Sequence, residues 1–114
     1  MTIDAAPEVS AEQALRLVSA GADVLDVRDP WEWNEGHAPQ ALHVPLPHLP
    51  IAQIPQWAVQ RVVVLCRSGN RARSATQLLR NRGVEAYAVA GGMGAWRDAG
   101  GRVVSTTGSP GLVA

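Results

Sequence analysis

The apolar positions of this sequence form two patterns that alternate along the chain. Short, continuous apolar runs rich in β-branched residues predict buried strands, and they cover residues 24–27, 41–44, 62–65 and 87–89. Apolar residues spaced three and four apart predict helices between these runs, over residues 11–20, 31–35, 72–82 and 92–96. Strands that alternate with helices at this spacing predict an α/β domain with a mostly parallel sheet.

Boundary signals support the same elements. Ser10 and Gln13 have the spacing of a capping box at the start of the first helix. Pro30 suits the first turn of the second helix, and Gly36 ends that helix. Residues 46–60 carry three prolines, so we expect a loop there with a helical turn or two.

Length and composition fit one domain. The chain has 114 residues, of which 46% are hydrophobic and 18% charged, values typical of a globular protein. We expect residues 1–104 to form the domain. Residues 105–114, rich in Ser, Thr, Gly and Pro, are expected to form a loosely ordered tail.

Composition also excludes several kinds of function. Ten basic and ten acidic side chains balance, so no global charge favours nucleic acid or anionic lipid. All the basic residues are arginines, and without a lysine the chain cannot form a Schiff base. No apolar run is long enough to span a membrane, and residues 1–10 show no secretory signal, so we expect a cytoplasmic protein. A single cysteine excludes an internal disulfide.

That cysteine, Cys66, follows the predicted strand over residues 62–65. In parallel sheets the functional crevice lies beyond the carboxyl ends of the strands. Gly69 permits a tightly curled loop whose N–H groups bind an anion, and Arg67 and Arg71 place positive charge beside the sulfur. A lone cysteine is commonly a structural core residue, but these surroundings favour a thiolate nucleophile.

Four segments resemble the signatures of the rhodanese superfamily, in the same order and spacing. They are Cys66-Arg67-Ser68-Gly69-Asn70-Arg71-Ala72, Asp26-Val27-Arg28 with Glu32 and Gly36-His37, residues 41–45, and residues 91–96. The resemblance covers residues 8–104. It implies a rhodanese-like fold with about five strands and helices on both faces of the sheet. Gln40 and His43 depart from the usual pattern, in which glycine and asparagine are frequent.

The resemblance also implies a reaction. Cys66 would take the outer sulfur of a donor such as thiosulfate as a persulfide and pass it to cyanide, a small thiol or a protein thiol. The substrate-binding loop would be Arg67, Ser68, Gly69, Asn70 and Arg71, with the two arginines docking anionic donors. No cofactor is required, and we expect a monomer or weak dimer without nucleic-acid or membrane partners.

Other polar residues have mainly structural interpretations. Asp26, Arg28 and Glu32 are expected to make at least one ion pair or backbone contact, because an isolated buried charge is costly. We expect them to brace the catalytic loop, and direct contact with the substrate is the alternative. His37 is expected to stabilise a turn by hydrogen bonding. The spacing of the three histidines (His37, His43 and His48) matches no common metal site. The four tryptophans (Trp31, Trp33, Trp57 and Trp96) are expected in the core or at a pocket rim.

Two alternatives to sulfur transfer remain at this stage. One is a phosphatase or arsenate reductase. Tyrosine-type phosphatases separate cysteine from arginine by five residues, whereas four separate Cys66 from Arg71. The other is a non-turnover persulfide carrier or a module that binds a protein partner.

Overall fold

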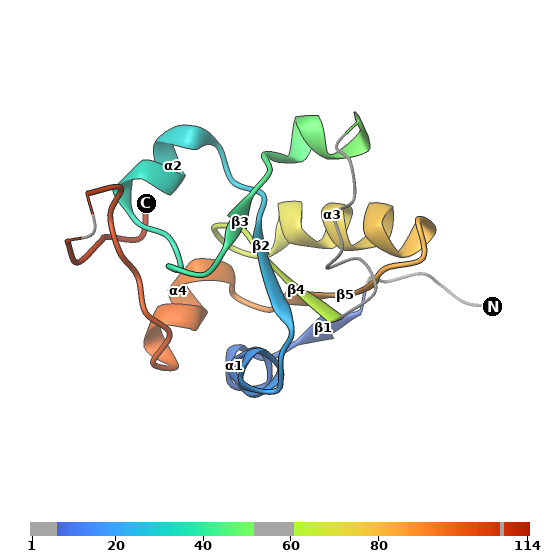
Figure 1. Cartoon of the computed structure of the whole chain (residues 1–114), viewed down its shortest axis with the longest axis horizontal. Helices are drawn as coiled ribbons and strands as arrows, with labels where there is room; N and C mark the ends of the chain where they lie inside the picture. Colours follow the sequence, from blue (N-terminus) through green and yellow to red (C-terminus); the bar gives the residue numbers. More distant parts are fainter. Residues whose placement is uncertain (1–6, 52–60, 108) are drawn as a thin grey trace.

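A five-stranded, all-parallel sheet forms the centre of the molecule, with the strand order β1-β5-β4-β2-β3 (Figure 1). This computed structural model describes residues 7–51, 61–107 and 109–114. The strands are β1 (Glu8–Val9), β2 (Asp23–Asp26), β3 (Leu42–His43), β4 (Arg61–Leu65) and β5 (Glu85–Val89). The predicted α/β class, strand number and parallel arrangement are therefore confirmed.

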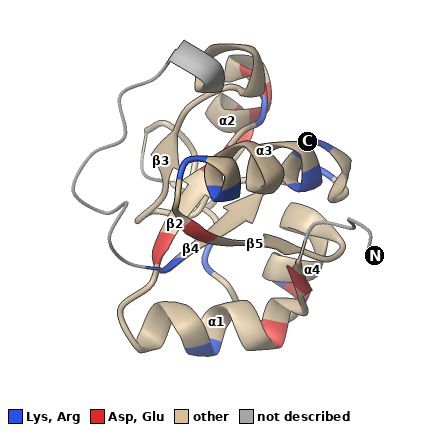
Figure 2. Ribbon diagram, turned by 90° about the vertical axis from the view of Figure 1, so that its right-hand side faces the viewer, with Lys and Arg blue, Asp and Glu red and all other residues tan. Residues whose placement is uncertain are grey.

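Helices cover both faces of this sheet, as predicted (Figure 2). They are α1 (Ala11–Ser19), α2 (Pro30–Glu35), the 3-10 helix η1 (Leu46–Ile51), α3 (Asn70–Asn81) and α4 (Gly92–Asp98). Helices α1 and α4 pack on one face, and α3 and η1 pack on the other. None of the helices in the described part of the chain is long and apolar enough to cross a membrane.

The central strand β4 explains why the core divides into two layers. Val62 and Val64 face α3, whereas Val63 and Leu65 face α1 and α4, and all four are completely buried. Side chains of successive strand residues point to opposite faces, so a strand covered on both sides must be apolar throughout. Cys66 follows directly at the carboxyl end of this strand and is 1% exposed.

The predicted helix boundaries hold at the first two helices. Gln13 N donates to Ser10 Oγ at 3.0 Å, and Ser10 N donates to Gln13 Oε1 at 2.8 Å, so the capping box is formed. Helix α2 begins at Pro30 and has Gly36 as its C-cap.

Some elements differ from the prediction. Strand β1 was not predicted, because two residues are too few to show a period, and it is fixed by pairing with β5. Helix α3 begins at Asn70 instead of residue 72, since Gly69 already adopts the N-cap position. The helical turns expected within residues 46–60 are present as η1. The remainder, residues 52–60 with Trp57, lies outside the described residues.

The described residues beyond 104, predicted as a tail, make backbone hydrogen bonds to the domain. Leu112 N donates to Glu35 O at 2.9 Å, and Gly111 N donates to Val103 O at 3.1 Å. Val113 packs against the apolar layer of α1 and α4. Although Ser, Thr, Gly and Pro predominate in this segment, its backbone N–H groups donate hydrogen bonds to carbonyl groups of α2.

Candidate active site

The loop that begins at Cys66 curls around its own sulfur. Gly69 N donates a hydrogen bond to Cys66 Sγ at 2.9 Å. Gly69 has φ 114°, in the left-handed region, which is the conformation expected of glycine in a tightly curled loop. Helix α3 begins at the next residue, so its amino-terminal end lies beside the sulfur. Both features favour negative charge at this position.

A second helix approaches the same loop from the other side. Met93 N, in the first turn of α4, donates to Cys66 O at 2.8 Å. A Cβ at Gly92 would lie 2.5 Å from Arg67 O and closer still to Cys66 O. The absence of a side chain at Gly92 therefore allows α4 to pack closely against the loop.

Arg71 is held by Glu32 in a two-point ion pair. Arg71 Nη1 lies 2.6 Å from Glu32 Oε1, and Arg71 Nη2 lies 2.8 Å from Glu32 Oε2. The more exposed carboxylate of Asp29 lies 3.9 Å from Arg71 Nη1. Glu32 Oε1 also accepts a hydrogen bond from Asp29 N at 2.9 Å, so one carboxylate both caps α2 and anchors the loop arginine.

This arrangement determines the charge state of the pair. Burial raises the pKa of Glu32, but the hydrogen bonds from Arg71 and from Asp29 N outweigh burial and leave that pKa below its ordinary value. The hydrogen bond to Glu32 raises the pKa of Arg71, and the nearby Cys66 sulfur adds to that rise. Glu32 is therefore ionised at neutral pH, and both terminal nitrogens of the Arg71 guanidinium are hydrogen-bonded to it.

The predicted brace contains a second, fully buried ion pair. Arg28 Nη2 lies 2.8 Å from Asp26 Oδ2, and both side chains are inaccessible to solvent. Arg28 Nη2 also donates to Gly36 O at 2.6 Å, which ties the end of β2 to the end of α2. Asp26 stands opposite Leu65, the last residue of β4, so this pair lies under the start of the cysteine loop.

The remaining loop residues are accessible. Arg67, Ser68 and Asn70 are exposed. Among the residues that the structure describes, the Arg67 side chain has no hydrogen-bond or ion-pair partner. The Asn70 side chain accepts a hydrogen bond from Arg73, whose guanidinium also pairs with Glu8 at 2.9 Å.

Sequence reasoning missed this role of Arg73. The spacing of three residues between Asn70 and Arg73 places the two side chains on one face of a helix, but the predicted helix began only at residue 72. Glu8 could not have been found in this way, because it reaches Arg73 only through the unpredicted pairing of β1 with β5.

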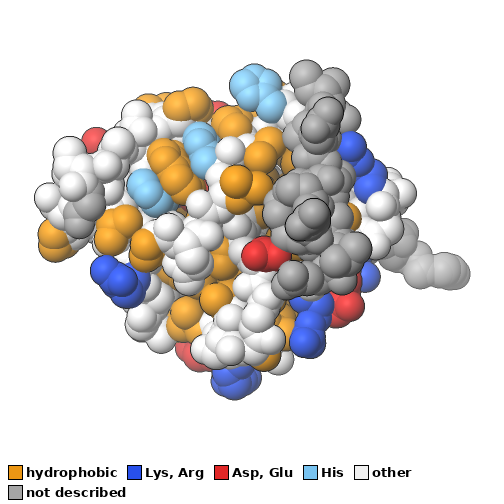
Figure 3. Space-filling view, viewed as in Figure 1, with side chains coloured by type: hydrophobic (Ala, Val, Ile, Leu, Met, Phe, Trp, Pro, Cys, Tyr) orange, Lys and Arg blue, Asp and Glu red, His pale blue; other side chains and the backbone are white. Residues whose placement is uncertain are grey.

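His37 lies outside the loop and holds α2. Its Nδ1 is 2.8 Å from Trp33 O, and its ring stacks on Trp33 with centroids 3.6 Å apart. The opposite face of Trp33 stacks on His43 at 4.6 Å. His43 Nε2 lies 2.8 Å from Arg28 O, which can only accept, so Nε2 carries a proton. Figure 3 shows histidine side chains next to hydrophobic ones on this face of the molecule.

The predicted site residues thus fall into two groups. Residues 66–69 form the loop at the carboxyl end of β4, residues 70 and 71 begin α3, and Glu32 reaches Arg71 from α2. Asp26, Arg28 and His37 lie in the supporting structure. Within the described residues, no group of three His, Cys, Asp or Glu side chains could hold a metal ion.

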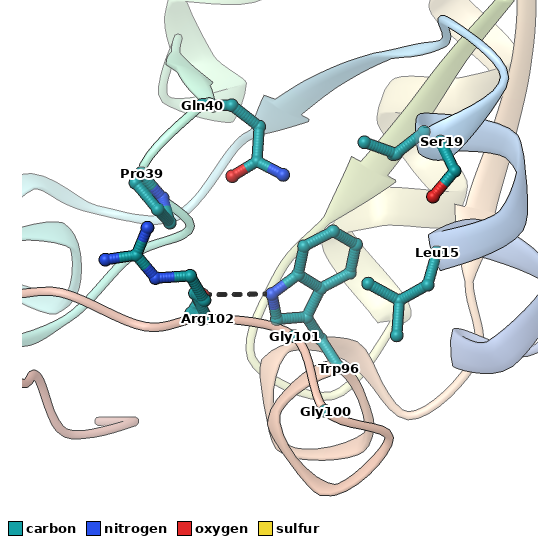
Figure 4. Close-up of a pocket in the computed structure, with 9 residues that line it drawn as sticks. Leu15, Ser19, Pro39, Gln40, Trp96, Gly100, Gly101 and Arg102 are labelled. Carbon is teal, nitrogen blue, oxygen red and sulfur yellow. Dashed lines mark hydrogen bonds between the residues drawn. The ribbon is translucent and has the colours of Figure 1, made fainter.

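A separate hollow lies between α1 and α4. Leu15, Trp96, Gln40 and Arg102 are among its lining residues (Figure 4). Trp96 is fully buried and donates from Nε1 to Arg102 O at 3.2 Å. No residue of the loop over 66–71 lines this hollow, so it is distinct from the cysteine site.

Comparisons with known proteins agree with the fold. A family model described as "Rhodanese-like domain" matches residues 10–99. An uncharacterized protein of Synechocystis is 39% identical over 88 residues, which cover 76% of this chain. The chain spans 49% of that relative's length.

Two solved structures share the fold. A rhodanese-related protein from Thermoplasma volcanium is 27% identical with a TM-score of 0.73, covering 86% of this chain and 97% of that one. A protein of unknown function from Rhodopseudomonas palustris, named "Possible Tyrosine Phosphatase", is 26% identical with a TM-score of 0.74. That match covers 85% of this chain and 83% of the other.

Proposed function

This chain belongs to the rhodanese-like domain family, and on that premise we propose that it is a sulfurtransferase that carries sulfane sulfur on Cys66. The observation that carries the proposal is the hydrogen bond from Gly69 N to Cys66 Sγ at 2.9 Å, inside a loop that opens helix α3. A sulfur in such a cradle is stabilised as a thiolate, which is the nucleophilic form.

In the first step, the Cys66 thiolate attacks the outer sulfur of a donor. With thiosulfate, a bond forms between Cys66 Sγ and that sulfur, while the sulfur–sulfur bond of thiosulfate breaks. Sulfite leaves with the electron pair, and Cys66 becomes a persulfide. The loop N–H groups of residues 67–71 would hold the charged terminal sulfur, as Gly69 N holds Sγ in the resting protein.

In the second step, an acceptor nucleophile attacks the terminal sulfur. Cyanide, a small thiol or a protein thiol forms the new bond to sulfur, and the bond to Cys66 Sγ breaks. The electron pair returns to Cys66 as the thiolate. The two steps balance without an external oxidant, a resolving cysteine or a cofactor, which agrees with a chain that has one cysteine.

Arg67 and Arg71 have different contacts, so we assign them different roles. Arg71 is committed to Glu32 by two hydrogen bonds, so its main contribution is to fix the start of α3 beside the sulfur. Arg67 is exposed and lacks a partner among the described residues, so it is the loop cation that receives the anionic end of a donor. Both arginines were expected to dock anionic donors. We propose this docking role for Arg67 and a positioning role for Arg71.

A phosphatase or arsenate reductase is the less favoured reading. One similar structure carries the words "Possible Tyrosine Phosphatase" in its name, and such chemistry also uses a cysteine in an anion-binding loop. Here, however, Arg71 follows Cys66 after four residues and is held by Glu32. The position that the longer loop would need for arginine is Ala72, which is fully buried. A binding module or persulfide carrier would share the cysteine but turn over slowly.

Steady-state turnover separates these functions. The protein is mixed with thiosulfate and cyanide, and thiocyanate is measured beside a Cys66→Ser variant. We expect thiocyanate formation by the unaltered protein and none above background by the variant. Persulfide formation without turnover would favour a carrier. Hydrolysis of a phosphate ester or reduction of arsenate, with no thiocyanate, would overturn the proposal.

A further inference from the structure

Residues 103–107 and 109–112, called the strap below, lie across the carboxyl end of α2. In Figure 1 this segment, drawn in dark red, runs beside α2. His37 N donates to Val104 O and Val104 N donates to His37 O, both at 2.9 Å, as a short antiparallel bridge. Farther along, Thr106 N donates to Asn34 O at 3.3 Å, and Leu112 N donates to Glu35 O at 2.9 Å.

Helix α2 needs such partners because it has only six residues. A helix of this length is not stable by itself, and its last carbonyl groups have no partner within the helix. The N–H groups of Thr106 and Leu112 supply partners for two of these carbonyls. The strap therefore stabilises α2 mainly through backbone hydrogen bonds, and the Thr106 hydroxyl adds a polar contact to Asn34. Backbone bonds of this kind do not show in the composition.

The position of α2 matters because this helix carries Glu32. Glu32 lies in the first turn of α2 and holds Arg71, the second residue of α3, through two hydrogen bonds. The contacts thus run from the strap to α2, from α2 to Arg71, and from Arg71 to the loop whose Gly69 N–H reaches Cys66 Sγ.

We propose that the strap positions Arg71 for reaction at Cys66 by fixing α2 and its Glu32 carboxylate. The proposal rests on the proposed sulfurtransferase function for its kinetic consequence. Val104, Thr106 and Leu112 are in this sense positioning residues, since they act through Glu32 and Arg71 and touch neither sulfur nor donor.

Gly36 shows how closely the strap and α2 are fitted. A Cβ at this position would lie 2.8 Å from Leu112 N and 2.8 Å from Val103 Cγ1, and it would overlap Leu112 O. Gly36 has φ 177°, an extended conformation open to any residue. Alanine at position 36 would therefore create no backbone strain, and its methyl group would displace the strap.

Three variants test the proposal in the full chain. Gly36→Ala displaces the strap by steric overlap. Leu112→Pro removes the N–H group that bonds Glu35 O, while losing a side chain that is 71% exposed. Leu112→Ala is the matched control, because it removes the same side chain and keeps the N–H group. Thermal melting and the NMR spectrum establish that each variant is folded.

The first measurement is the titration of the Glu32 carboxyl carbon by NMR. Arg71 and Asp29 N hold the pKa of Glu32 below its ordinary value in the intact site. We expect Gly36→Ala and Leu112→Pro to move this titration to higher pH, and Leu112→Ala to leave it unchanged. The second measurement is the rate of persulfide formation against pH. In both strap variants, the fall of this rate at acidic pH should move to higher pH, as the Glu32 titration does. At neutral pH the rate should be lower by about tenfold.

An unchanged Glu32 titration in both Gly36→Ala and Leu112→Pro would overturn the proposal. A shift of equal size in Leu112→Ala would also contradict it, because that variant keeps the strap bond. If the unaltered protein forms no persulfide with any donor, the proposed function fails, but the carboxyl titration still tests the role of the strap.

Discussion

Arg71 Nη1 and Glu32 Oε1 lie 2.6 Å apart although their residues are separated by 39 positions in the sequence. The pair joins α2 to the start of α3, immediately after the cysteine loop. Glu32 is 5% exposed and Arg71 32%, so water screens the pair only from one side. The geometry assigns Arg71 first to the architecture of the site and leaves Arg67 as the cation open to an anionic donor.

Replacing Glu32 by glutamine removes the charge and retains the shape. Because the hydrogen bonds involve charged groups and one partner is buried, we expect the free energy of unfolding to fall by about 1.5–3 kcal/mol. Persulfide formation should slow as Arg71 loses its fixed position. Urea unfolding and single-turnover kinetics measure the two effects.

Asp29→Asn is the control for that change. Asp29 approaches Arg71 only to 3.9 Å, and its side chain is 55% exposed. We expect a loss of about 0.5 kcal/mol or less. Equal losses for Glu32→Gln and Asp29→Asn would mean that overall charge, and not the buried pair, stabilises the site.

The same pair predicts how stability depends on pH. In the folded state the pKa of Glu32 is below its ordinary value of 4.5. Its contribution is therefore fully present above pH 4.5 and is lost as the pH falls through the lowered folded pKa. The free energy of unfolding, measured by urea at a series of acidic pH values, should fall less steeply in Glu32→Gln than in the unaltered protein. Parallel curves would contradict this.

Arg67 is predicted to act on donor binding and not on folding. Its side chain is exposed and has no partner among the described residues, so Arg67→Gln should change the free energy of unfolding by about 0.5 kcal/mol or less. The KM for thiosulfate should rise by roughly tenfold, the equivalent of about 1.4 kcal/mol for a lost charged contact. Added salt should reduce the difference in KM between Arg67→Gln and the unaltered protein, because salt screens the attraction between Arg67 and the donor.

Arg67→Lys provides the matched control because it keeps the positive charge. We expect its KM for thiosulfate to remain closer to that of the unaltered protein. If Arg67→Gln leaves KM unchanged while lowering the rate of the chemical step, Arg67 does not dock the donor.

Replacement by alanine should change the stability of the protein in opposite directions at two glycines of α4, Gly92 and Gly94. Gly92 has φ 58°, and a Cβ there would lie 2.5 Å from Arg67 O, so Gly92→Ala should cost about 2 kcal/mol or more and displace the loop. A Cβ at Gly94 would meet Arg67 Nη1 at 3.8 Å, an ordinary contact. Gly94→Ala should therefore stabilise the helix by up to about 1 kcal/mol. Thermal unfolding of both variants measures the contrast, and equal destabilisation would contradict it.

The sequence predicted the parts of this molecule that depend on local patterns. The apolar run at residues 62–65 indicated a strand buried on both faces, and the structure buries all four side chains. Ser10 and Gln13 indicated a helix start through their spacing alone, and both predicted hydrogen bonds are present. The curled loop followed from one residue, Gly69, whose positive φ the structure contains.

Relationships between distant segments were harder to predict. Nothing in the spacing of Glu32 and Arg71 indicates that they pair, because the contact depends on how α2 lies against α3. The stack of Trp33 between His37 and His43 likewise needs β3 beside β2. The strap was missed because the bonds that join it to α2 are mainly between backbone groups, which leave no pattern in the side chains.

The central claim, that Cys66 carries sulfur as a persulfide, is tested most directly by intact mass. The protein, with Cys66 reduced, is incubated with thiosulfate in the absence of an acceptor and weighed beside the Cys66→Ser variant. The account predicts a gain of one sulfur atom that cyanide removes and that the variant does not show. No gain with thiosulfate, a polysulfide or a low-molecular-weight persulfide as donor would contradict the sulfurtransferase function.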